Sequence, residues 1–240
     1  MSEHMHAVVI GASGGIGAAL VEQLAGRDDI TRVTAFARSP VVTHSRKVVA
    51  ASMDLLDEAS IGAGAQACTD PSPRLVLCAT GILHGADLQP EKSLRDIDPA
   101  KFARVMAINT IGPALVLKHF VPTLPREGRS VIALLSARVG SIADNRLGGW
   151  YAYRSSKAAL NQLVRTASIE AARRWKDAVI VGLHPGTVAT SLSSPFRGNV
   201  APGKLFTPGQ SASYLLSVLD KLSPADTGKC FAWDGSEIPP

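Results

Sequence analysis

The chain has 240 residues, a net charge of +5 and 46% hydrophobic residues. This length allows one large domain or two small ones, and the hydrophobic content excludes an intrinsically disordered chain. No run approaches the roughly 18 uninterrupted apolar residues of a membrane span, and the apolar run at residues 7–10 is too short for a signal peptide. We therefore expect a cytoplasmic globular protein without a membrane partner.

The three cysteines, Cys68, Cys78 and Cys230, are widely spaced and include no CxxC pair. This spacing predicts neither a disulfide framework nor a zinc site, so we expect no metal. The basic residues are scattered and aromatic residues make up only 5% of the chain, a pattern that disfavours nucleic-acid binding. The excess of positive charge instead fits an anionic small-molecule ligand.

Short apolar runs alternate with longer helical patterns along the chain. Strands are predicted at residues 6–10, 32–37, 47–51, 74–78, 130–135, 178–183 and 229–233, and helices at residues 16–26, 55–67, 99–121, 153–175 and 208–222. The strand runs are continuously apolar, which is typical of parallel strands covered on both faces. The β-α-β alternation therefore predicts a doubly wound α/β fold with helices on both faces of the sheet.

Residues 195–209 form the one extended irregular region of the sequence and are rich in Pro and Gly. Only one helix and one strand are predicted after it, which is too little for a second domain. We therefore predict a single domain over residues 1–240, with a mobile loop over a site at 195–209.

A glycine-rich turn, Gly11-Ala12-Ser13-Gly14-Gly15-Ile16-Gly17, separates the first predicted strand from the first predicted helix. Glycines let the chain turn tightly and let a ligand approach the backbone, and the helix N-terminus that follows attracts phosphate. The spacing differs from the GxGxxG fingerprint, and the Lys-Ser/Thr of a P-loop is missing, which disfavours an NTPase. The turn therefore predicts binding of a phosphate-bearing ligand by another class of protein.

The same turn also fits GxSxG, in which Ser13 would be a hydrolase nucleophile with Asp144 and His184 following in the required order. A nucleophile of this kind normally follows several strands, whereas Ser13 follows the first one. A hydrolase is therefore a minor alternative.

Arg38 comes directly after the second predicted strand. An acidic residue in this region would bind the ribose 2′-hydroxyl of NAD, whereas an arginine favours the 2′-phosphate of NADP. Arg46 and Lys47 add positive charge nearby. These residues favour NADP(H) over NAD(H) as the cofactor.

Tyr153 and Lys157 stand at i and i+4 near the start of a predicted helix, so both project from one face. A tyrosine with an ordinary pKa of about 10 is a poor acid or base at neutral pH. A nearby lysine ammonium stabilises the phenolate and lowers that pKa, as acid–base catalysis requires. A tyrosine and a lysine at this spacing are common on exposed helices. Here the pair follows a glycine turn and a strand that ends in Ser136, and this order of motifs favours a functional role for it.

Together these motifs resemble the short-chain dehydrogenase/reductase family, over nearly the whole chain. Within the family, residues 136–142, 149–157 and 233–238 are similar to the C-factor and sniffer-like carbonyl reductases. The resemblance implies a Rossmann-type sheet of seven mostly parallel strands. It also implies an oxidoreductase that uses NADP(H) to reduce an aldehyde or ketone to an alcohol, or the reverse.

The resemblance assigns roles to the residues at matching positions. Catalytic roles fall on Ser136, Tyr153, Lys157 and Asn109. Cofactor contacts are expected at Gly11, Ser13, Gly15, Ile16, Gly17, Arg38, Asp54, Leu55, Ala79, Thr80, Gly81, Asn109, Tyr153, Lys157, Pro185, Gly186, Val188 and Thr190.

In the implied mechanism the substrate oxygen accepts hydrogen bonds from Ser136 and Tyr153, and Tyr153 gives its proton to the developing alkoxide. Lys157 binds the nicotinamide ribose and holds down the pKa of Tyr153. Asn109 supports a proton-relay water, and Thr190 bonds the carboxamide of the cofactor. Asp54 and Leu55 contact the adenine.

One departure from the family pattern follows the fourth predicted strand. The usual Asn-Asn-Ala-Gly is replaced by Cys78-Ala79-Thr80-Gly81, so the asparagine bonds that brace the central strands are missing. We expect Thr80 or a water to take their place, and Cys78 to pack at the end of the strand.

A second departure concerns the serine. Ser136 lies further from Tyr153 than is usual, and an alignment anchored on Gly140 puts Ala137 in the serine position. We choose Ser136 because it ends the apolar strand, with Ser141 as the fallback. The extra residues, 144–149, are expected to form a turn beside the active site.

The resemblance leaves one alternative function and one expectation about assembly. The alternative is a C-factor-like signalling or NADP-sensing protein with little turnover, because a fold does not fix a function. The family often pairs its two long helices, so we expect a homodimer or homotetramer formed through residues 99–121 and 153–175. A small-molecule carbonyl or alcohol is the expected partner in either assembly.

Overall fold

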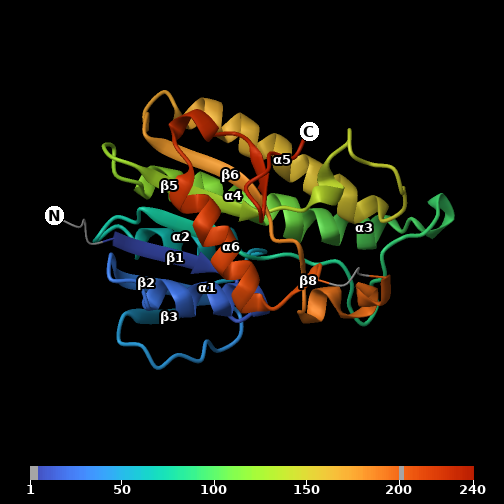
Figure 1. Cartoon of the computed structure of the whole chain (residues 1–240), viewed down its shortest axis with the longest axis horizontal. Helices are drawn as coiled ribbons and strands as arrows, with labels where there is room; N and C mark the ends of the chain where they lie inside the picture. The colour runs from blue at the N-terminus through green and yellow to red at the C-terminus, as the bar shows by residue number, and fades with distance from the viewer. Residues whose placement is uncertain (1–4, 200–202) are drawn as a thin grey trace.

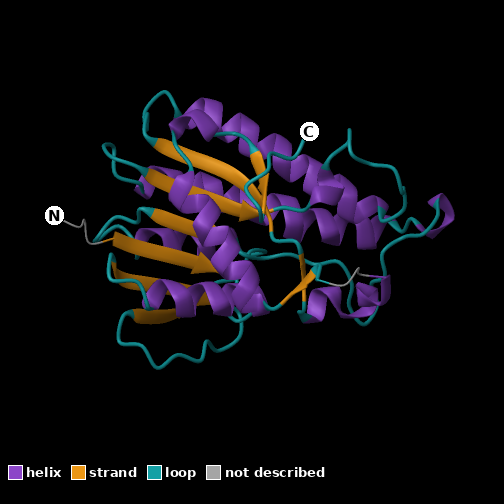
Figure 2. Ribbon diagram, in the orientation of Figure 1, coloured by secondary structure: helices purple, strands orange, loops and turns teal. Residues whose placement is uncertain are grey.

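The computed structural model describes residues 5–199 and 203–240. Seven strands form one sheet in the order β3-β2-β1-β4-β5-β6-β9 (Figures 1 and 2). They are β1 (Met5–Ile10), β2 (Ile30–Ala37), β3 (Val48–Ser52), β4 (Leu75–Cys78), β5 (Ser130–Leu135), β6 (Ala178–His184) and β9 (Cys230–Ala232). Each neighbouring pair is parallel, so the predicted seven-stranded doubly wound sheet is confirmed.

Helices cover both faces of this sheet (Figure 2). One face carries α1 (Gly15–Ala25) and α6 (Pro208–Lys221), and the other carries α2 (Glu58–Gln66), α4 (Gly112–Phe120) and α5 (Tyr151–Ala171). Side chains alternate along each strand, so Val131 packs toward α1 and α6 whereas Ile132 packs toward α4 and α5. This two-sided burial is why the central strands β4, β5 and β6 are almost continuously apolar, whereas the edge strand β3 is largely exposed.

The run over residues 99–123 differs from the single regular helix that was predicted. It consists of α3 (Pro99–Met106), a π-helical segment η2 (Ala107–Ile111), α4 and a 3-10 turn η3 (Val121–Thr123). Asn109 lies in the π-helical segment, and its side chain bonds to Ile82 and Ser156 rather than to solvent. Such insertions within helices are frequent at functional sites.

By length and composition alone, Pro99–Thr123 could also cross a membrane. Its most apolar 18-residue window has a mean hydropathy of 1.3 and is 44% buried inside the protein. Val105, Val116 and Phe120 from this run are at most 2% exposed and pack into the apolar clusters of the fold. In this structure the run therefore serves as a core helix.

Local sequence explains where two helices begin. Asp57 accepts a hydrogen bond from the backbone N–H of Ala59 at 3.0 Å, so α2 begins at Glu58 rather than at the expected residue 55. Before α5, Trp150 has a left-handed φ of 53° and ends the turn over residues 144–149. The helix therefore begins at Tyr151, two residues before the expected start.

A small second sheet pairs β7 (Thr187–Val188) with β8 (Leu205–Phe206), and the 3-10 segment η5 (Ser191–Asn199) lies between them along the chain. The sequence predicted only a loop here, because strands of two residues leave no periodic signal. Residues 200–202 of the predicted mobile loop lie outside the described residues.

Candidate active site

A groove runs along the carboxyl ends of the strands, where the strand order reverses between β1 and β4. Ligands of doubly wound sheets bind at such a reversal. One part of the groove, here the glycine-turn cavity, has a volume of about 230 Å³ and includes Gly11 and Arg38. The other part, the tyrosine cavity, has a volume of about 350 Å³ and includes Tyr153 and Lys157. Residues 79–81 line both parts, so the two cavities are continuous.

Most of the predicted site residues line this groove. The glycine-turn cavity contains Gly11, Ser13, Arg38, Asp54 and Leu55. The tyrosine cavity contains Gly15, Ile16, Ser136, Tyr153, Lys157, Pro185 and Thr190. Gly17, Asn109, Gly186 and Val188 line neither cavity and support the residues that do.

The glycine-rich turn is held so closely that side chains would not fit. Gly11 has a φ of +89°, and a Cβ on it would lie 2.9 Å from the carbonyl oxygen of Ala79. A Cβ on Gly17 would collide with the carbonyl oxygen of Gly11. The helix α1 then begins at Gly15 without a capping side chain and without an acidic residue in its first turn. Its N-terminus is therefore available to an anionic group in the groove.

The segments after β2 and β3 form the far wall of the glycine-turn cavity. Arg38 is exposed there, beside the exposed Ser39. Asp54 uses its carboxylate locally, accepting a hydrogen bond from the backbone N–H of Leu56 at 3.0 Å. Leu55 is buried against Gly112, so it adds an apolar surface to the cavity.

The replacement of the usual Asn-Asn-Ala-Gly changes the bonding at the end of β4. The hydroxyl of Thr80 lies 3.3 Å from the thiol of Cys78, and burial raises the pKa of that thiol. Thr80 thus bonds to its own strand, and Cys78 packs at the strand end as expected. At Gly81, a Cβ would lie 3.6 Å from Nζ of Lys157, so the backbone passes close to the lysine.

Tyr153 and Lys157 project from the first two turns of α5 into the tyrosine cavity. Nζ of Lys157 donates to the carbonyl oxygen of Leu135 at 2.8 Å and lies 5.8 Å from the ring centroid of Tyr153. Burial lowers the pKa of Lys157 to about 8 and raises the pKa of Tyr153 to about 12. The expected lowering of the Tyr153 pKa is thus not found, because burial dominates and the lysine bonds elsewhere.

Asn109 is fully buried between α5 and the loop after β4. Its Oδ1 accepts from the N–H of Ile82 at 2.8 Å, and its Nδ2 donates to the carbonyl oxygen of Ile82 at 2.9 Å and to Oγ of Ser156 at 3.1 Å. The asparagine therefore fixes the loop at Ile82, which lines the tyrosine cavity, to the helix that carries Tyr153.

Ser136 lies at the end of β5 and lines the tyrosine cavity. Its hydroxyl donates to Oδ1 of Asn161 on α5 at 2.6 Å. The fallback residue, Ser141, is 2% exposed and bonds to Pro240, and its Oγ accepts from the N–H of Asp144.

The segment after β6 closes the groove from the side of α6. Gly186 has a φ of +77°, and a Cβ there would lie 2.6 Å from the ring of Phe206. The carbonyl oxygen of Pro185 accepts from Oγ of Ser211 at 2.9 Å, which ties the segment to α6. Thr190 packs against Gly15 of the glycine turn, so this segment and the turn approach each other closely.

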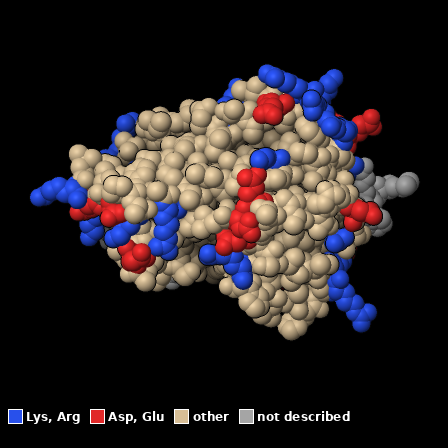
Figure 3. Space-filling model, turned by 180° about the vertical axis from the view of Figure 1, so that it is seen from behind, with Lys and Arg blue, Asp and Glu red and all other residues tan. Residues whose placement is uncertain are grey.

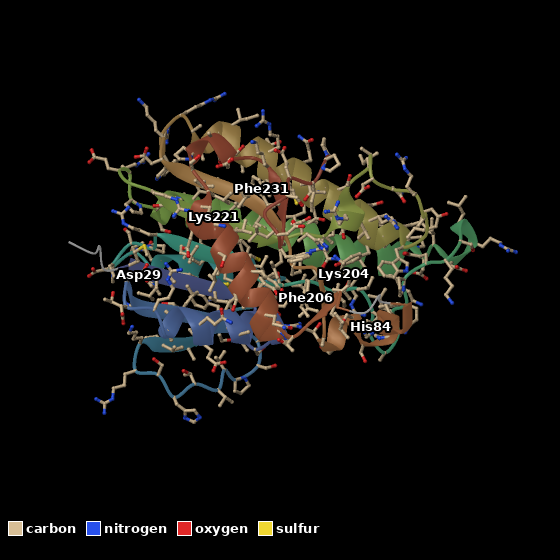
Figure 4. All side chains as sticks on the ribbon, in the orientation of Figure 1. Asp29, His84, Lys204, Phe206, Lys221 and Phe231 are labelled. Atoms are coloured by element: carbon tan, nitrogen blue, oxygen red, sulfur yellow. The ribbon has the colours of Figure 1, made fainter. Side chains whose placement is uncertain are left out.

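Two phenylalanines, Phe196 and Phe206, lie in the predicted irregular region over residues 195–209 and make different contacts. Phe206, which is labelled in Figure 4, packs against Tyr214 and Trp233, and it lines neither cavity. Phe196 instead contacts Trp150 and the ring of His84, with centroids 5.0 and 5.7 Å apart. Phe196 therefore belongs to the wall above Tyr153.

The other members of this wall come from separate loops, which is why no single motif in the sequence revealed them. Leu83, Val139, Trp150, Leu192 and Phe196 pack in one apolar cluster with Tyr153. The Trp150 ring lies edge-on to that of Tyr153 at 6.2 Å. The loop over residues 144–149 leads into Trp150, so the end of this loop lies close to Tyr153.

Sequence reasoning also missed Glu91, which is 5% exposed. Its carboxylate accepts from the N–H of Ala152 at 3.2 Å, and its carbonyl oxygen accepts from the N–H of Trp150 at 2.5 Å. Glu91 thus binds N–H groups at the start of α5, close to Tyr153. An acidic residue in a long loop carries no signal of such a contact.

The hydrolase alternative has no support from the geometry. Ser13 is exposed in the glycine-turn cavity, whereas Asp144 pairs with Arg138 at 3.1 Å. Nδ1 of His184 is buried without a hydrogen-bond partner among the described residues, and burial lowers the pKa of this histidine to about 4. The three residues therefore do not form a triad.

A family model described as short chain dehydrogenase matches residues 5–200. The chain therefore belongs to the short-chain dehydrogenase family, and it is an oxidoreductase with the fold and the ordered motifs of that family.

Individual relatives support this assignment. The chain is 39% identical over 147 residues to C-signal of Myxococcus xanthus, a match that covers 61% of this chain and 83% of that protein. The NADPH-bound carbonyl reductase from chicken fatty liver has a TM-score of 0.84 and 27% identity, covering 99% of this chain and 94% of that one. The carbonyl reductase Sniffer of D. melanogaster shares the fold, with a TM-score of 0.84 and 22% identity over 98% of this chain and 100% of that one. The match to C-signal confirms the predicted C-factor resemblance, and the match to Sniffer shows that the two proteins share a fold.

Proposed function

We propose that this protein is an NADP(H)-dependent carbonyl reductase that interconverts an aldehyde or ketone and an alcohol. The observation that carries the proposal is that Tyr153 and Lys157 meet in a cavity continuous with the glycine-turn cavity. A dinucleotide lying along the groove would therefore reach from the glycine turn to the residues that transfer a proton.

The residues along the groove fit NADP(H). Gly11 and Gly15 sit where a Cβ would collide with neighbouring atoms, which leaves bare backbone at the place expected for the pyrophosphate. Arg38 supplies an exposed guanidinium at the place expected for a 2′-phosphate. The structural neighbour from chicken was solved with NADPH bound, which supports the same preference. Asp54 and Leu55 would contact the adenine, and Thr190 the carboxamide.

When bound, NADPH supplies the hydride that the substrate carbon accepts. The chain supplies the proton and the charge stabilisation. Burial raises the pKa of Tyr153 to about 12, so the phenol holds its proton at neutral pH and donates it to the substrate oxygen. The pKa of Lys157, lowered by burial to about 8, leaves most of the lysine charged at pH 7, where it stabilises the tyrosinate that remains.

The apolar wall above Tyr153 bears on the substrate. Leu83, Trp150, Leu192 and Phe196 offer hydrocarbon and aromatic surface beside Tyr153. A pocket of this kind favours a carbonyl compound with an apolar or aromatic body over a charged one.

The signalling alternative is not favoured. It rests on the match to C-signal, which covers 61% of this chain, whereas the carbonyl reductase from chicken matches 99% of it. Tyr153 and Lys157 both face the cavity, which a protein that only senses NADP would not need.

NADPH titration by fluorescence, followed by a panel of aldehydes, ketones and quinones, tests the proposal. We expect NADPH binding and turnover of at least one carbonyl by the native chain. The Tyr153→Phe variant should lose kcat by about 100-fold or more with little change in NADPH affinity. Binding without any turnover by the native chain would instead favour the sensing alternative.

A further inference from the structure

The end of β5 directs two successive side chains to opposite sides. The N–H of Ser136 donates to the carbonyl oxygen of Leu183 at 2.8 Å and so continues the pairing of β5 with β6. Ala137 is also extended, with φ −153° and ψ 146°. Side chains of consecutive extended residues point to opposite faces. Ser136 and Ala137 therefore have different surroundings, although they are neighbours in sequence.

The hydroxyl group of Ser136 already donates its hydrogen to another residue of the protein. The residue is 3% exposed, and its hydroxyl donates to Oδ1 of Asn161 at 2.6 Å. The thiol of Cys230 is a second hydrogen-bonding neighbour of this hydroxyl. A serine hydroxyl has one hydrogen to donate, so what remains toward the cavity is lone-pair density. A carbonyl oxygen that gains negative charge needs donors rather than acceptors.

On the other side, Ala137 belongs to the apolar cluster of Leu83 and Tyr153. The turn that follows is fixed against the catalytic helix, because a Cβ on Gly140 would lie 2.8 Å from Cβ of Lys157. The residue beside Tyr153 is thus held in place and carries only a methyl group. The next hydroxyl along the chain, that of Ser141, is buried and bonded to Pro240.

We infer that the substrate oxygen receives its hydrogen bond from Tyr153 without help from a serine at the end of β5. Ala137, which packs beside Tyr153, carries no hydrogen-bond donor, and Ser136 is a positioning residue that ties β5 to α5 through Asn161. This inference rests on the proposed function, and it removes Ser136 from the residues expected to contact the substrate.

Substitutions at the two positions test the inference in steady-state assays with NADPH and one carbonyl substrate. Ala137→Ser adds a donor beside Tyr153, and Ala137→Cys adds a group of the same shape whose thiol donates weakly. We expect kcat of Ala137→Ser to exceed that of Ala137→Cys by about 10-fold or more. Equal kcat values for the two variants would overturn the inference.

Ser136→Ala gives the complementary result. We expect kcat to fall by less than about 10-fold with an unchanged pH profile, and the melting temperature to fall because Asn161 loses its partner. A loss of 100-fold or more in kcat, at unchanged NADPH affinity and restored by Ser136→Thr, would overturn the inference. If Ser136→Ala does not fold, the Ala137 pair decides alone. Tyr153→Phe distinguishes a failure of the proposed function from a failure of this inference. Full turnover by that variant would contradict the proposed function itself.

Discussion

At the scale of single residues, burial sets the chemistry of the site. Tyr153 is 8% exposed and Lys157 is 2% exposed, and both ionised forms are disfavoured by the loss of water. Their pKa values consequently move in opposite directions, so the tyrosine keeps its proton more firmly and the lysine holds its proton less firmly. This arrangement suits a site that donates a proton at neutral pH.

The pH dependence of reduction follows from Lys157. Its pKa is lowered to about 8, so the lysine is charged below that pH and neutral above it. Because the charged form stabilises the tyrosinate, kcat/KM for reduction should fall about 10-fold per pH unit above about pH 8. A pH profile of kcat/KM between pH 6 and 10 measures this. A flat profile up to pH 10 would show that the lysine charge is not needed.

We propose that Arg38 sets the preference for NADP(H) over NAD(H). Arg38→Asp replaces the partner of a 2′-phosphate with a group that repels it and that can bond to a ribose 2′-hydroxyl. We expect the ratio of kcat/KM for NADPH to that for NADH to fall by about 100-fold. Arg46→Asp, which makes the same charge change outside the groove, is the matched control. If the ratio falls equally in both variants, the preference for NADPH depends on the overall positive charge of this region and not on a contact with Arg38.

At the scale of elements, the start of α5 determines where the side chains of the candidate active site lie. This helix carries Tyr153, Ser156, Lys157 and Asn161, and its first turn is held by Glu91 rather than by a local capping side chain. The left-handed Trp150 precedes it and supplies part of the apolar wall. The position of the helix therefore depends on a contact from a distant loop.

Glu91→Ala should disturb the start of α5, because it removes the carboxylate that accepts from the N–H of Ala152. We expect a loss of about 1 kcal/mol in the free energy of unfolding, as for other caps, together with a fall in kcat larger than the change in KM for NADPH. Glu91→Gln keeps an oxygen acceptor and should restore most of kcat. Asp98→Ala removes the cap of α3 with a comparable loss of stability, and it should leave kcat unchanged. If Asp98→Ala lowers kcat as much as Glu91→Ala does, Glu91 contributes to the stability of the fold and not to the position of Tyr153.

The elements also show what the sequence could predict. Continuous apolar runs located all seven strands, and the glycine turn and the Tyr153–Lys157 pair are local motifs, so they were visible without a structure. The π-helical segment around Asn109 and the cap from Glu91 depend on partners far along the chain. The same holds for the direction of the Ser136 hydroxyl, which only the position of Asn161 reveals.

At the scale of the whole molecule, the groove and the outer helices lie on different parts of the surface. Seen from behind, Lys and Arg are interspersed with Asp and Glu among broad uncharged areas (Figure 3). A cavity of about 610 Å³ lies between α4 and α5 and is lined by Leu117, Leu163 and Trp175 among others. These two helices are the ones through which we predict a homodimer or homotetramer.

Thr166→Arg tests that assembly. Thr166 is exposed on α5 and lines this outer cavity, so an arginine should be tolerated by the folded chain while obstructing a partner. We expect the native chain to be dimeric or tetrameric by light scattering after size exclusion, and the variant to dissociate with an unchanged circular dichroism spectrum. A native chain that is monomeric at micromolar concentrations would contradict the prediction.

The proposed function requires that this chain transfers hydride from NADPH to a carbonyl carbon, with Tyr153 as the proton donor. Deuterated NADPH, labelled at the transferable position, tests it by mass spectrometry of the alcohol product. We predict one deuterium on the carbinol carbon with the native chain, and about 100-fold less labelled product with Tyr153→Phe. Tight NADPH binding with no labelled alcohol from any carbonyl in the panel would contradict the account.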